Sequence, residues 1–300
     1  MAQPTVLVTG AKGFTGAYLV PALEARDYCV HGLVADTTTS EREHRADLHQ
    51  IHELRTLLEK IKPDYIIHLA AISYVAHGHI ADFYQTNLLG TLNLLQATQD
   101  VGITPKKIIL ASSANIYGNP AVDRITETET PKPMNHYGNS KLAMEQMAEL
   151  WFDTFPIVIT RPFNYTGLGQ SPNFLIPKIV QHFREQKTQI SLGNLDVIRD
   201  VSDVHFVVES YIRLLESEAR SVAMNICSGV GYTIQAMLDI MQQLAGYHIT
   251  VETAANLVRK NEIQKLIGCN QQLLATIGDI PRPDLAAILS RMYQLETFTA

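Results

Sequence analysis

The feature that most restricts the fold of this chain is a glycine-rich turn, TGAKGFTG, which directly follows the apolar segment TVLVT at residues 5–9. Its glycines, Gly10, Gly13 and Gly16, recur every three residues and open a segment with helical spacing. Between a strand and a helix, such glycines allow a tight turn and a close backbone approach, and the free N–H groups at the helix start bind phosphate. A glycine trio alone is a weak signal, but this position predicts a dinucleotide-binding unit.

Short apolar segments alternate with helical patterns through the first half of the chain. Further strands are expected at 28–34, 64–71, 107–112 and 156–160, and helices at 14–26, 52–62, 87–98 and 137–151. Near-continuous apolar strands separated by helices of about ten or more residues are typical of a parallel sheet covered on both faces. The sequence therefore predicts an α/β fold built on a doubly wound, Rossmann-type parallel sheet.

The pattern changes after Pro162, where glycine, proline and asparagine cluster in RPFNYTGLGQSPN. The strand–helix alternation returns later, before a tail with the character of a smaller α/β lobe. We predict a dinucleotide-binding domain at 1–163 with return segments near 200–228, and a smaller C-terminal substrate lobe at 164–199 and 229–300.

Composition and charge narrow the class of protein. The 300 residues are 46% hydrophobic and 18% charged, as in globular proteins. The net charge is −6 and no block of Lys and Arg occurs, so neither a nucleic acid nor a membrane surface is expected as a partner.

Three scattered cysteines and the lack of a leader or of ~20 consecutive apolar residues predict a cytoplasmic protein with reduced thiols. No His or Cys cluster has convincing ligand spacing, so no metal is predicted.

A serine, a tyrosine and a lysine are positioned for catalysis. Ser113 follows the strand KIILAS, and Tyr137 and Lys141 are four residues apart on one face of a predicted helix. A nearby ammonium is expected to lower the tyrosine pKa from about 10, and such a tyrosine is a general acid or base. Any YxxxK pair can be an exposed helix pair, but this one follows the fourth strand of a glycine-turn fold. Ser113 lies where open α/β sheets bind ligands and could hold a substrate oxygen.

Motifs spread over nearly the whole chain carry a family resemblance. They are TGAKGFTG, Asp47–Leu48, HLAA (68–71), SSANIYG (112–118), YGNSK (137–141) and RPFN (161–164). Together they resemble the extended short-chain dehydrogenase/reductases that act on nucleotide sugars. The resemblance implies that Ser113, Tyr137 and Lys141 are catalytic and that Lys141 also holds the nicotinamide ribose. His136 replaces the family's usual proline, which puts the loop before the tyrosine in question.

The cofactor is expected to bind across the glycine turn, including Lys12 and Phe14. The resemblance implies that Asp47 and Leu48 face the adenine, and that Leu69, Ala70 and Ala71 line the ribose and pyrophosphate. Asp36 follows the second strand and could accept the ribose diol of NAD(H), or it could be a solvated loop acid. Lys12, with Arg42 and Arg45 nearby, would instead suit a 2′-phosphate. We slightly favour NADP(H), with NAD(H) as the alternative.

The distal half most resembles the GDP-mannose 4,6-dehydratases and the GDP-4-keto-6-deoxy-D-mannose reductases. The segments concerned are RPFNYTGLGQ, NFLIPKIV, LGNLDVIRDVSDV, NICSGVG and VRKNEIQKLIGCN. By this resemblance the sugar nucleotide contacts Ser113, Asn115, Asn164, Lys178, Arg199, Arg259 and Glu262, unless Glu262 only orients Arg259. Arginine forks and amide donors suit a nucleotide diphosphate, although an arginine alone is more often a surface charge.

Asn115 separates two reactions. Dehydratases of this group carry a glutamate there, two residues after the Ser/Thr, and an amide cannot abstract a proton. We therefore expect an NAD(P)H-dependent reductase of a GDP-4-keto-6-deoxy-hexose that gives a GDP-6-deoxyhexose, GDP-D-rhamnose, with Tyr137 as proton donor. The alternatives are a 4,6-dehydratase or 4-epimerase that retains its cofactor and uses another acid, Asp123 or Glu127, and a non-catalytic dinucleotide sensor. By resemblance, a homodimer would pair the helices at 87–98 and 137–151.

Overall fold

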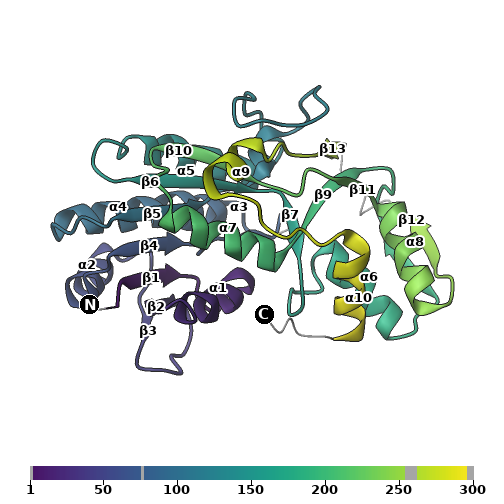
Figure 1. The fold of residues 1–300 in the computed structure, drawn as a ribbon, viewed down its shortest axis with the longest axis horizontal. Helices are drawn as coiled ribbons and strands as arrows, with labels where there is room; N and C mark the ends of the chain where they lie inside the picture. The colour runs from purple at the N-terminus through teal and green to yellow at the C-terminus, as the bar shows by residue number, and fades with distance from the viewer. Residues whose placement is uncertain (1–2, 76–77, 254–261, 296–300) are drawn as a thin grey trace.

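A parallel sheet of seven strands organises the first half of the molecule (Figure 1). The computed structural model describes residues 3–75, 78–253 and 262–295. The strands are β1 (Thr5–Thr9), β2 (Cys29–Val34), β3 (Glu43–Arg45), β4 (Tyr65–His68), β5 (Lys107–Ala111), β6 (Ile157–Pro162) and β10 (Val222–Ile226). Their order is β10-β6-β5-β4-β1-β2-β3, and each neighbouring pair is parallel. The predicted doubly wound α/β fold is confirmed.

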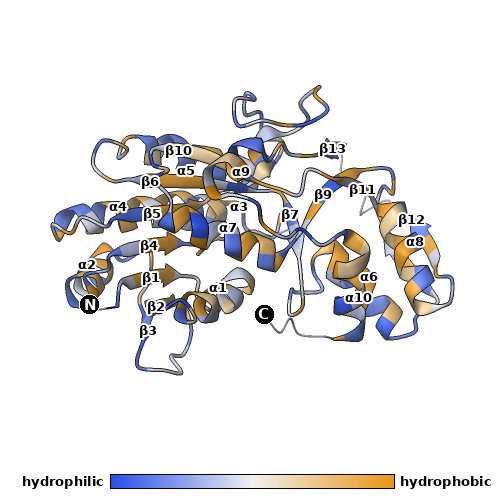
Figure 2. Cartoon of the chain, in the orientation of Figure 1, coloured by the Kyte–Doolittle hydropathy of each residue, from blue (hydrophilic) through white to orange (hydrophobic). Residues whose placement is uncertain are grey.

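Helices cover both faces of this sheet because its strands are apolar on both sides. Val6 and Val8 of β1 pack with α1 (Phe14–Glu24) and α7 (Val204–Glu216), and Leu7 points to the opposite face. That second face is covered by α2 (Ile51–Ile61), α4 (Gly90–Asp100) and α5 (His136–Glu149). Figure 2 shows hydrophobic colour along β1, β4 and β6 between these helix layers. Burying both faces of the strands removes a large apolar area from water, and this burial holds the sheet between the two layers of helices.

Several elements differ from the sequence expectation. The strand predicted at 64–71 ends at His68, and the helix predicted at 87–98 begins as α3 (Ile80–Tyr84) and a π-helical turn, Gln85–Leu89. Neither β3 nor β9 (Ile198–Asp203) was predicted. Both are rich in charged residues and lack the apolar alternation by which strands are predicted.

The second half of the chain builds smaller sheets and a separate core. Here β9 pairs with β7 (Asn164–Thr166), β11 (Gly231–Thr233) and β13 (Lys265–Leu266), and β8 (Gln189–Leu192) pairs with β12 (Thr250–Thr253). The helices α6 (Leu175–Arg184), α8 (Ile234–Ala245) and α10 (Leu285–Gln294) share one apolar cluster and lie together at one end of the molecule (Figure 1). Another helix, α9 (Gln271–Ile277), packs instead with α1 and α7 against the large sheet. No helix in the described part of the chain is long and apolar enough to cross a membrane.

Candidate active site

A cavity of about 260 Å³ opens at the carboxyl ends of the central strands. It brings together most of the glycine turn, the three predicted catalytic residues and three of the seven predicted sugar contacts, namely Ser113, Asn115 and Asn164. Its lining includes Gly10, Gly13, Phe14, Gly16, Leu69, Ala71, Ser113, Asn115, Tyr137, Lys141 and Asn164. This is the edge at which open α/β sheets bind their ligands.

A second cavity, of about 840 Å³, adjoins the first. The two share Gly10 and Ala71, and the second is also lined by Asp47, Leu48 and Ala70. Together they run from the end of β2, past the glycine turn, to Tyr137. Asp47 and Leu48, expected to face the adenine, therefore lie in the second cavity, whereas the predicted catalytic residues lie in the first with Asn115 and Asn164.

The glycine turn fits a dinucleotide because it leaves room where a side chain would intrude. Gly10 has φ of +70°, and a Cβ atom on it would lie 2.9 Å from the Ala70 nitrogen. A Cβ on Gly16 would lie 2.4 Å from the Gly10 oxygen, so the helix start packs directly on the turn. The backbone can thus approach a pyrophosphate at the start of α1, whose dipole favours negative charge. The residues present fit a nicotinamide dinucleotide.

Helix α5 positions the tyrosine and the lysine. Its start is capped by Asn135, whose side-chain oxygen accepts a hydrogen bond from the Gly138 nitrogen at 2.7 Å. This cap fixes the helix start although His136 replaces the family's proline. A Cβ on Gly138 would lie 2.7 Å from the Asn115 oxygen, so only glycine lets α5 approach the turn that carries Ser113 and Asn115 this closely.

Ser113, Tyr137 and Lys141 converge in the interior. Their exposed fractions are 5%, 8% and 3%. The Tyr137 phenol is hydrogen-bonded to Ser113. The Lys141 Nζ donates to the Ala111 carbonyl oxygen at 2.6 Å, at the end of β5. The structure thus brings the three predicted catalytic side chains to one end of the first cavity.

The prediction that a nearby lysine lowers the pKa of Tyr137 was wrong. Burial raises the pKa of Tyr137 to about 12, and the hydrogen bond from Ser113 offsets only part of this shift. Burial also lowers the pKa of Lys141 to about 8, against the opposing charge of Glu145. Desolvation disfavours the charged form of both groups, so burial is the largest influence on the pKa of the phenol. At neutral pH the phenol therefore keeps its proton.

Asn115 lies beside the catalytic serine. Its backbone nitrogen and its Nδ2 both donate to Ser113 Oγ, each at 3.2 Å, and its Oδ1 accepts from Asn135 Nδ2 at 3.4 Å. Among the described residues, none that lines the first cavity carries a carboxyl group. The two candidate acids lie elsewhere: Asp123 pairs with Lys265 at 2.8 Å, and Glu127 accepts from the Asn225 nitrogen at 2.9 Å.

Other predicted residues lie outside the two cavity linings. The Lys12 side chain reaches from the glycine turn to the loop after β2, and Asp36 is an exposed residue of that loop. The Lys178 Nζ donates to the Ser191 carbonyl oxygen at 2.6 Å. Arg199 lies 3.9 Å from Glu262, which is therefore paired with Arg199. Arg259, the residue that Glu262 was expected to orient, lies outside the described residues.

Sequence reasoning missed several residues that line the first cavity. Ser112 is 3% exposed, and its hydroxyl has no hydrogen-bond partner among the described residues. Tyr165 hydrogen-bonds Thr15 at 2.7 Å and stacks on Phe14, and Phe174 contacts Tyr74 edge-on at a centroid distance of 6.0 Å. The doubled serine could have indicated Ser112, but Tyr165 of β7 and Phe174, just before α6, come from segments that only the tertiary fold brings to the cavity.

Known proteins place this chain in a family. The family model for GDP-mannose 4,6-dehydratase matches residues 7–277. The chain belongs to this family. The family resemblance drawn from the motifs is thereby confirmed, as is the prediction of an enzyme of the extended short-chain dehydrogenase/reductases.

Two similar proteins are named as enzymes of GDP-6-deoxyhexoses. One is the GDP-6-deoxy-D-talose 4-dehydrogenase of Aggregatibacter actinomycetemcomitans, 35% identical, with 96% of this chain and 97% of the relative covered. Another is the GDP-6-deoxy-D-mannose reductase of Pseudomonas aeruginosa, 32% identical, with 95% and 96% covered.

Solved structures agree on the fold. RMD from Pseudomonas aeruginosa, complexed with NADPH, has a TM-score of 0.85 and 30% identity over 97% of each chain. A Burkholderia cenocepacia protein provisionally named an epimerase has a TM-score of 0.91 and 38% identity, covering 98% of this chain and 99% of its own. Within the described ranges, no three His, Cys, Asp or Glu side chains gather closely enough to hold a metal ion.

Proposed function

We propose that this protein is an NAD(P)H-dependent reductase that converts the C4 ketone of a GDP-4-keto-6-deoxy-hexose to a hydroxyl. The observation that carries the proposal is the composition of the first cavity. It holds a protonated tyrosine, a serine and a lysine, whereas none of its described lining residues has a carboxyl group to remove the sugar C5 proton. Ketone reduction needs a proton donor and no such base, whereas 4,6-dehydration needs the base.

Each catalytic residue has a role in this reaction. Ser113 donates a hydrogen bond to the ketone oxygen, and Asn115 orients Ser113 through its Nδ2. A bound nicotinamide supplies the hydride. As C4 gains the hydride, the carbonyl electron pair moves to oxygen, and Tyr137 gives that oxygen its proton. Lys141 stabilises the resulting phenolate, which solvent reprotonates.

The remaining contacts follow the two cavities. The glycine turn, Asp47, Leu48 and the segment from Leu69 to Ala71 would hold the cofactor, with NADP(H) slightly favoured by the NADPH complex of the Pseudomonas aeruginosa structure. Asn164, Lys178 and Arg199 would hold the GDP sugar, with Arg259 and Glu262. The division into a cofactor domain at 1–163 and a substrate lobe at 164–199 and 229–300 belongs to the same proposal, as does a homodimer.

The configuration at C4 separates two products. GDP-D-rhamnose is the product proposed first, in keeping with the reductase relative. GDP-6-deoxy-D-talose is a second candidate because the relative at 35% identity is named for it. The two differ only in which face of the C4 ketone receives hydride.

Two parallel incubations test this function. The purified protein is mixed with GDP-4-keto-6-deoxy-mannose and NADPH in one, and with GDP-mannose and NADP⁺ or NAD⁺ in the other, and the sugars are followed by NMR. We expect NADPH oxidation and a single C4 alcohol in the first mixture and unchanged GDP-mannose in the second. Formation of a keto sugar from GDP-mannose would instead identify a dehydratase, and C4 inversion without net NADPH oxidation would identify an epimerase.

A further inference from the structure

Lys12, inside the glycine turn, is held by the loop that joins β2 to β3. Its Nζ donates to the Thr37 carbonyl oxygen at 2.6 Å and forms an ion pair with Glu43 Oε2 at 2.9 Å. Thr37 comes shortly after the last residue of β2, Val34. The Lys12 ammonium therefore lies at the carboxyl end of the second strand, where dinucleotide-binding sheets receive the adenosine ribose.

Glu43 is fixed by contacts that do not involve Lys12. The Thr39 nitrogen donates to its Oε2, and Thr39 Oγ1 lies 3.1 Å from Oε1 and 3.0 Å from Oε2. Its backbone is set by the pairing of Glu43 with Gly32 in the β2–β3 register. The hydrogen bond from Lys12, followed by that from the Thr39 nitrogen, lowers the pKa of Glu43 to about 2. Glu43 is thus a fixed negative charge at neutral pH.

We propose that Glu43 sets the choice between NADP(H) and NAD(H) by holding Lys12, the cation that would otherwise meet the 2′-phosphate of NADP(H). The inference rests on one part of the proposed function, a nicotinamide dinucleotide bound across the glycine turn. It does not depend on the identity of the sugar.

The arrangement allows Lys12 to exchange partners. The Lys12 and Glu43 side chains are 38% and 19% exposed, and an ion pair this open to solvent is weak. A 2′-phosphate can therefore take Lys12 from Glu43, and Glu43 would keep its hydrogen bonds to Thr39. The carboxylate competes with the phosphate for the lysine, and this competition weakens NADP(H) binding. The uncharged 2′-hydroxyl of NAD(H) does not compete for the lysine.

The test compares cofactor affinities without any sugar. Dissociation constants of NADPH and NADH are measured by nicotinamide fluorescence for the wild type and Glu43→Gln at two salt concentrations. We expect Glu43→Gln to bind NADPH about tenfold more tightly at low salt, with a smaller gain at high salt, and to bind NADH within about twofold of the wild type. Glu41→Gln is the matched control, because Glu41 is an exposed acid of the same loop.

A double-mutant cycle with Lys12→Met isolates the lysine. If Glu43 acts through Lys12, most of the NADPH gain disappears in Lys12→Met/Glu43→Gln. The inference is overturned if Glu43→Gln tightens both cofactors equally, if Glu41→Gln gives the same gain, or if the gain survives in the double variant. Failure of the wild type to bind either cofactor would overturn the proposed function itself, so the two failures are distinguishable.

Discussion

At the scale of single residues, burial decides the charge of the groups around the first cavity. The pKa of His68 is lowered to about 3, chiefly by burial and then by the charge of Lys141. The neutral imidazole bridges Thr9 at 2.6 Å and Thr91 at 2.9 Å. With Tyr137 also neutral, the site holds a proton donor and one nearby ammonium at neutral pH. A phenol can give a proton to a ketone oxygen only while it is protonated, as Tyr137 is at neutral pH.

The pKa of Lys141 makes stability depend on pH in a defined window. This pKa is about 8 in the folded chain and has a reference value of 10.5. Between these values the unfolded chain still binds the proton that the folded chain has released, so the free energy of unfolding rises with pH. Relative to Lys141→Met, we expect the wild type to gain about 3 kcal/mol across this window, as measured by urea titrations. A flat or falling difference would contradict the assigned pKa.

At the scale of elements, a buried ion pair joins the catalytic helix to the sheet. Glu145 of α5 and Arg161 of β6 are 1% and 7% exposed and approach to 2.7 Å. Arg161 Nη1 also donates to the Tyr117 hydroxyl at 2.9 Å, and that hydroxyl donates to Asn225 Oδ1 at 2.7 Å. The network therefore ties α5, β6 and β10 together beneath the active site.

Removing one partner of this pair leaves a buried charge without its counterion. We expect Glu145→Gln to lower the free energy of unfolding by about 3–5 kcal/mol. Glu149→Gln, one turn later at the exposed end of α5, should change it by less than about 0.5 kcal/mol. Chemical denaturation of both variants checks this, and equal effects would show that the pair contributes nothing specific.

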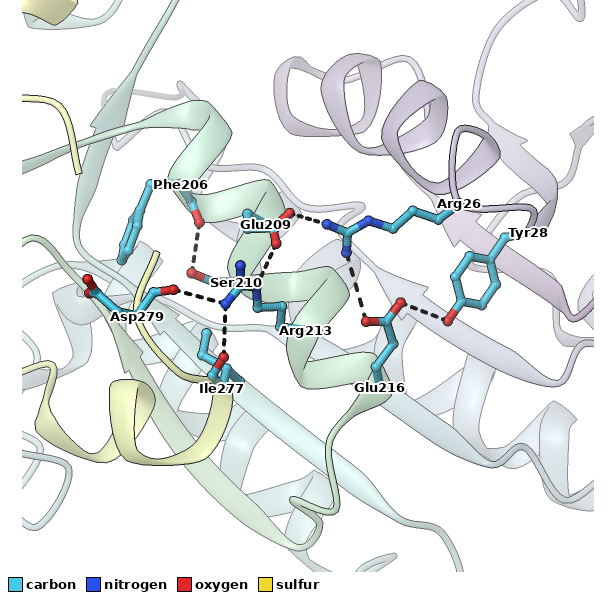
Figure 3. A network of polar contacts seen from close by, with 9 residues as sticks. All are labelled: Arg26, Tyr28, Phe206, Glu209, Ser210, Arg213, Glu216, Ile277 and Asp279. Carbon is cyan, nitrogen blue, oxygen red and sulfur yellow. Dashed lines mark hydrogen bonds and ion pairs between the residues drawn. The ribbon is translucent and has the colours of Figure 1, made fainter. Parts of the chain in front are cut away.

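Side chains of α7 form hydrogen bonds with neighbouring segments on both sides of the helix, as Figure 3 shows. On one side Glu209 accepts from Arg26, which follows α1, at 2.6 Å. On the other side Arg213, itself 2.6 Å from Glu209, donates to the carbonyl oxygens of Ile277 at 3.2 Å and Asp279 at 2.9 Å. Arg213 thereby anchors the segment after α9 to the large sheet's helix layer.

Removing the Arg213 side-chain contacts should moderately lower the free energy of unfolding. We expect Arg213→Met to lower the free energy of unfolding by about 1–2 kcal/mol, because the substitution removes hydrogen bonds to two carbonyl groups. The exposed Arg220, just after α7, serves as the control, and Arg220→Met should have little effect. Thermal unfolding followed by circular dichroism compares them, and an unchanged Arg213→Met would show that solvent satisfies those carbonyls equally well.

At the scale of the whole molecule, the parts that could be predicted are those with local signals. The apolar strands, the glycine turn and the Tyr137–Lys141 spacing each follow from neighbouring residues and a period, and their meeting at one sheet edge follows from the parallel topology. The structure agrees on β1, β5, β6 and α5 to within a few residues.

The parts that could not be predicted depend on contacts between distant segments. The Lys12–Glu43 pair requires β3, a charged strand without an apolar pattern, to pair beside β2. The pairing of Glu262 with Arg199 likewise depends on how β13 lies beside β9. The pKa of Tyr137 was expected to fall because spacing reveals a neighbouring lysine, whereas the depth of burial that raises it is set by the whole fold.

The most direct test of the account is the rate at which NADPH reduces GDP-4-keto-6-deoxy-mannose in a single turnover. The wild type is compared with Tyr137→Phe and with Tyr165→Phe, which removes another phenol of the same cavity, one that is bonded to Thr15. We predict that Tyr137→Phe slows the reaction by about 10²–10⁴-fold with NADPH affinity within about twofold, and that Tyr165→Phe slows it by less than about tenfold. A Tyr137→Phe enzyme as fast as the wild type would contradict the account.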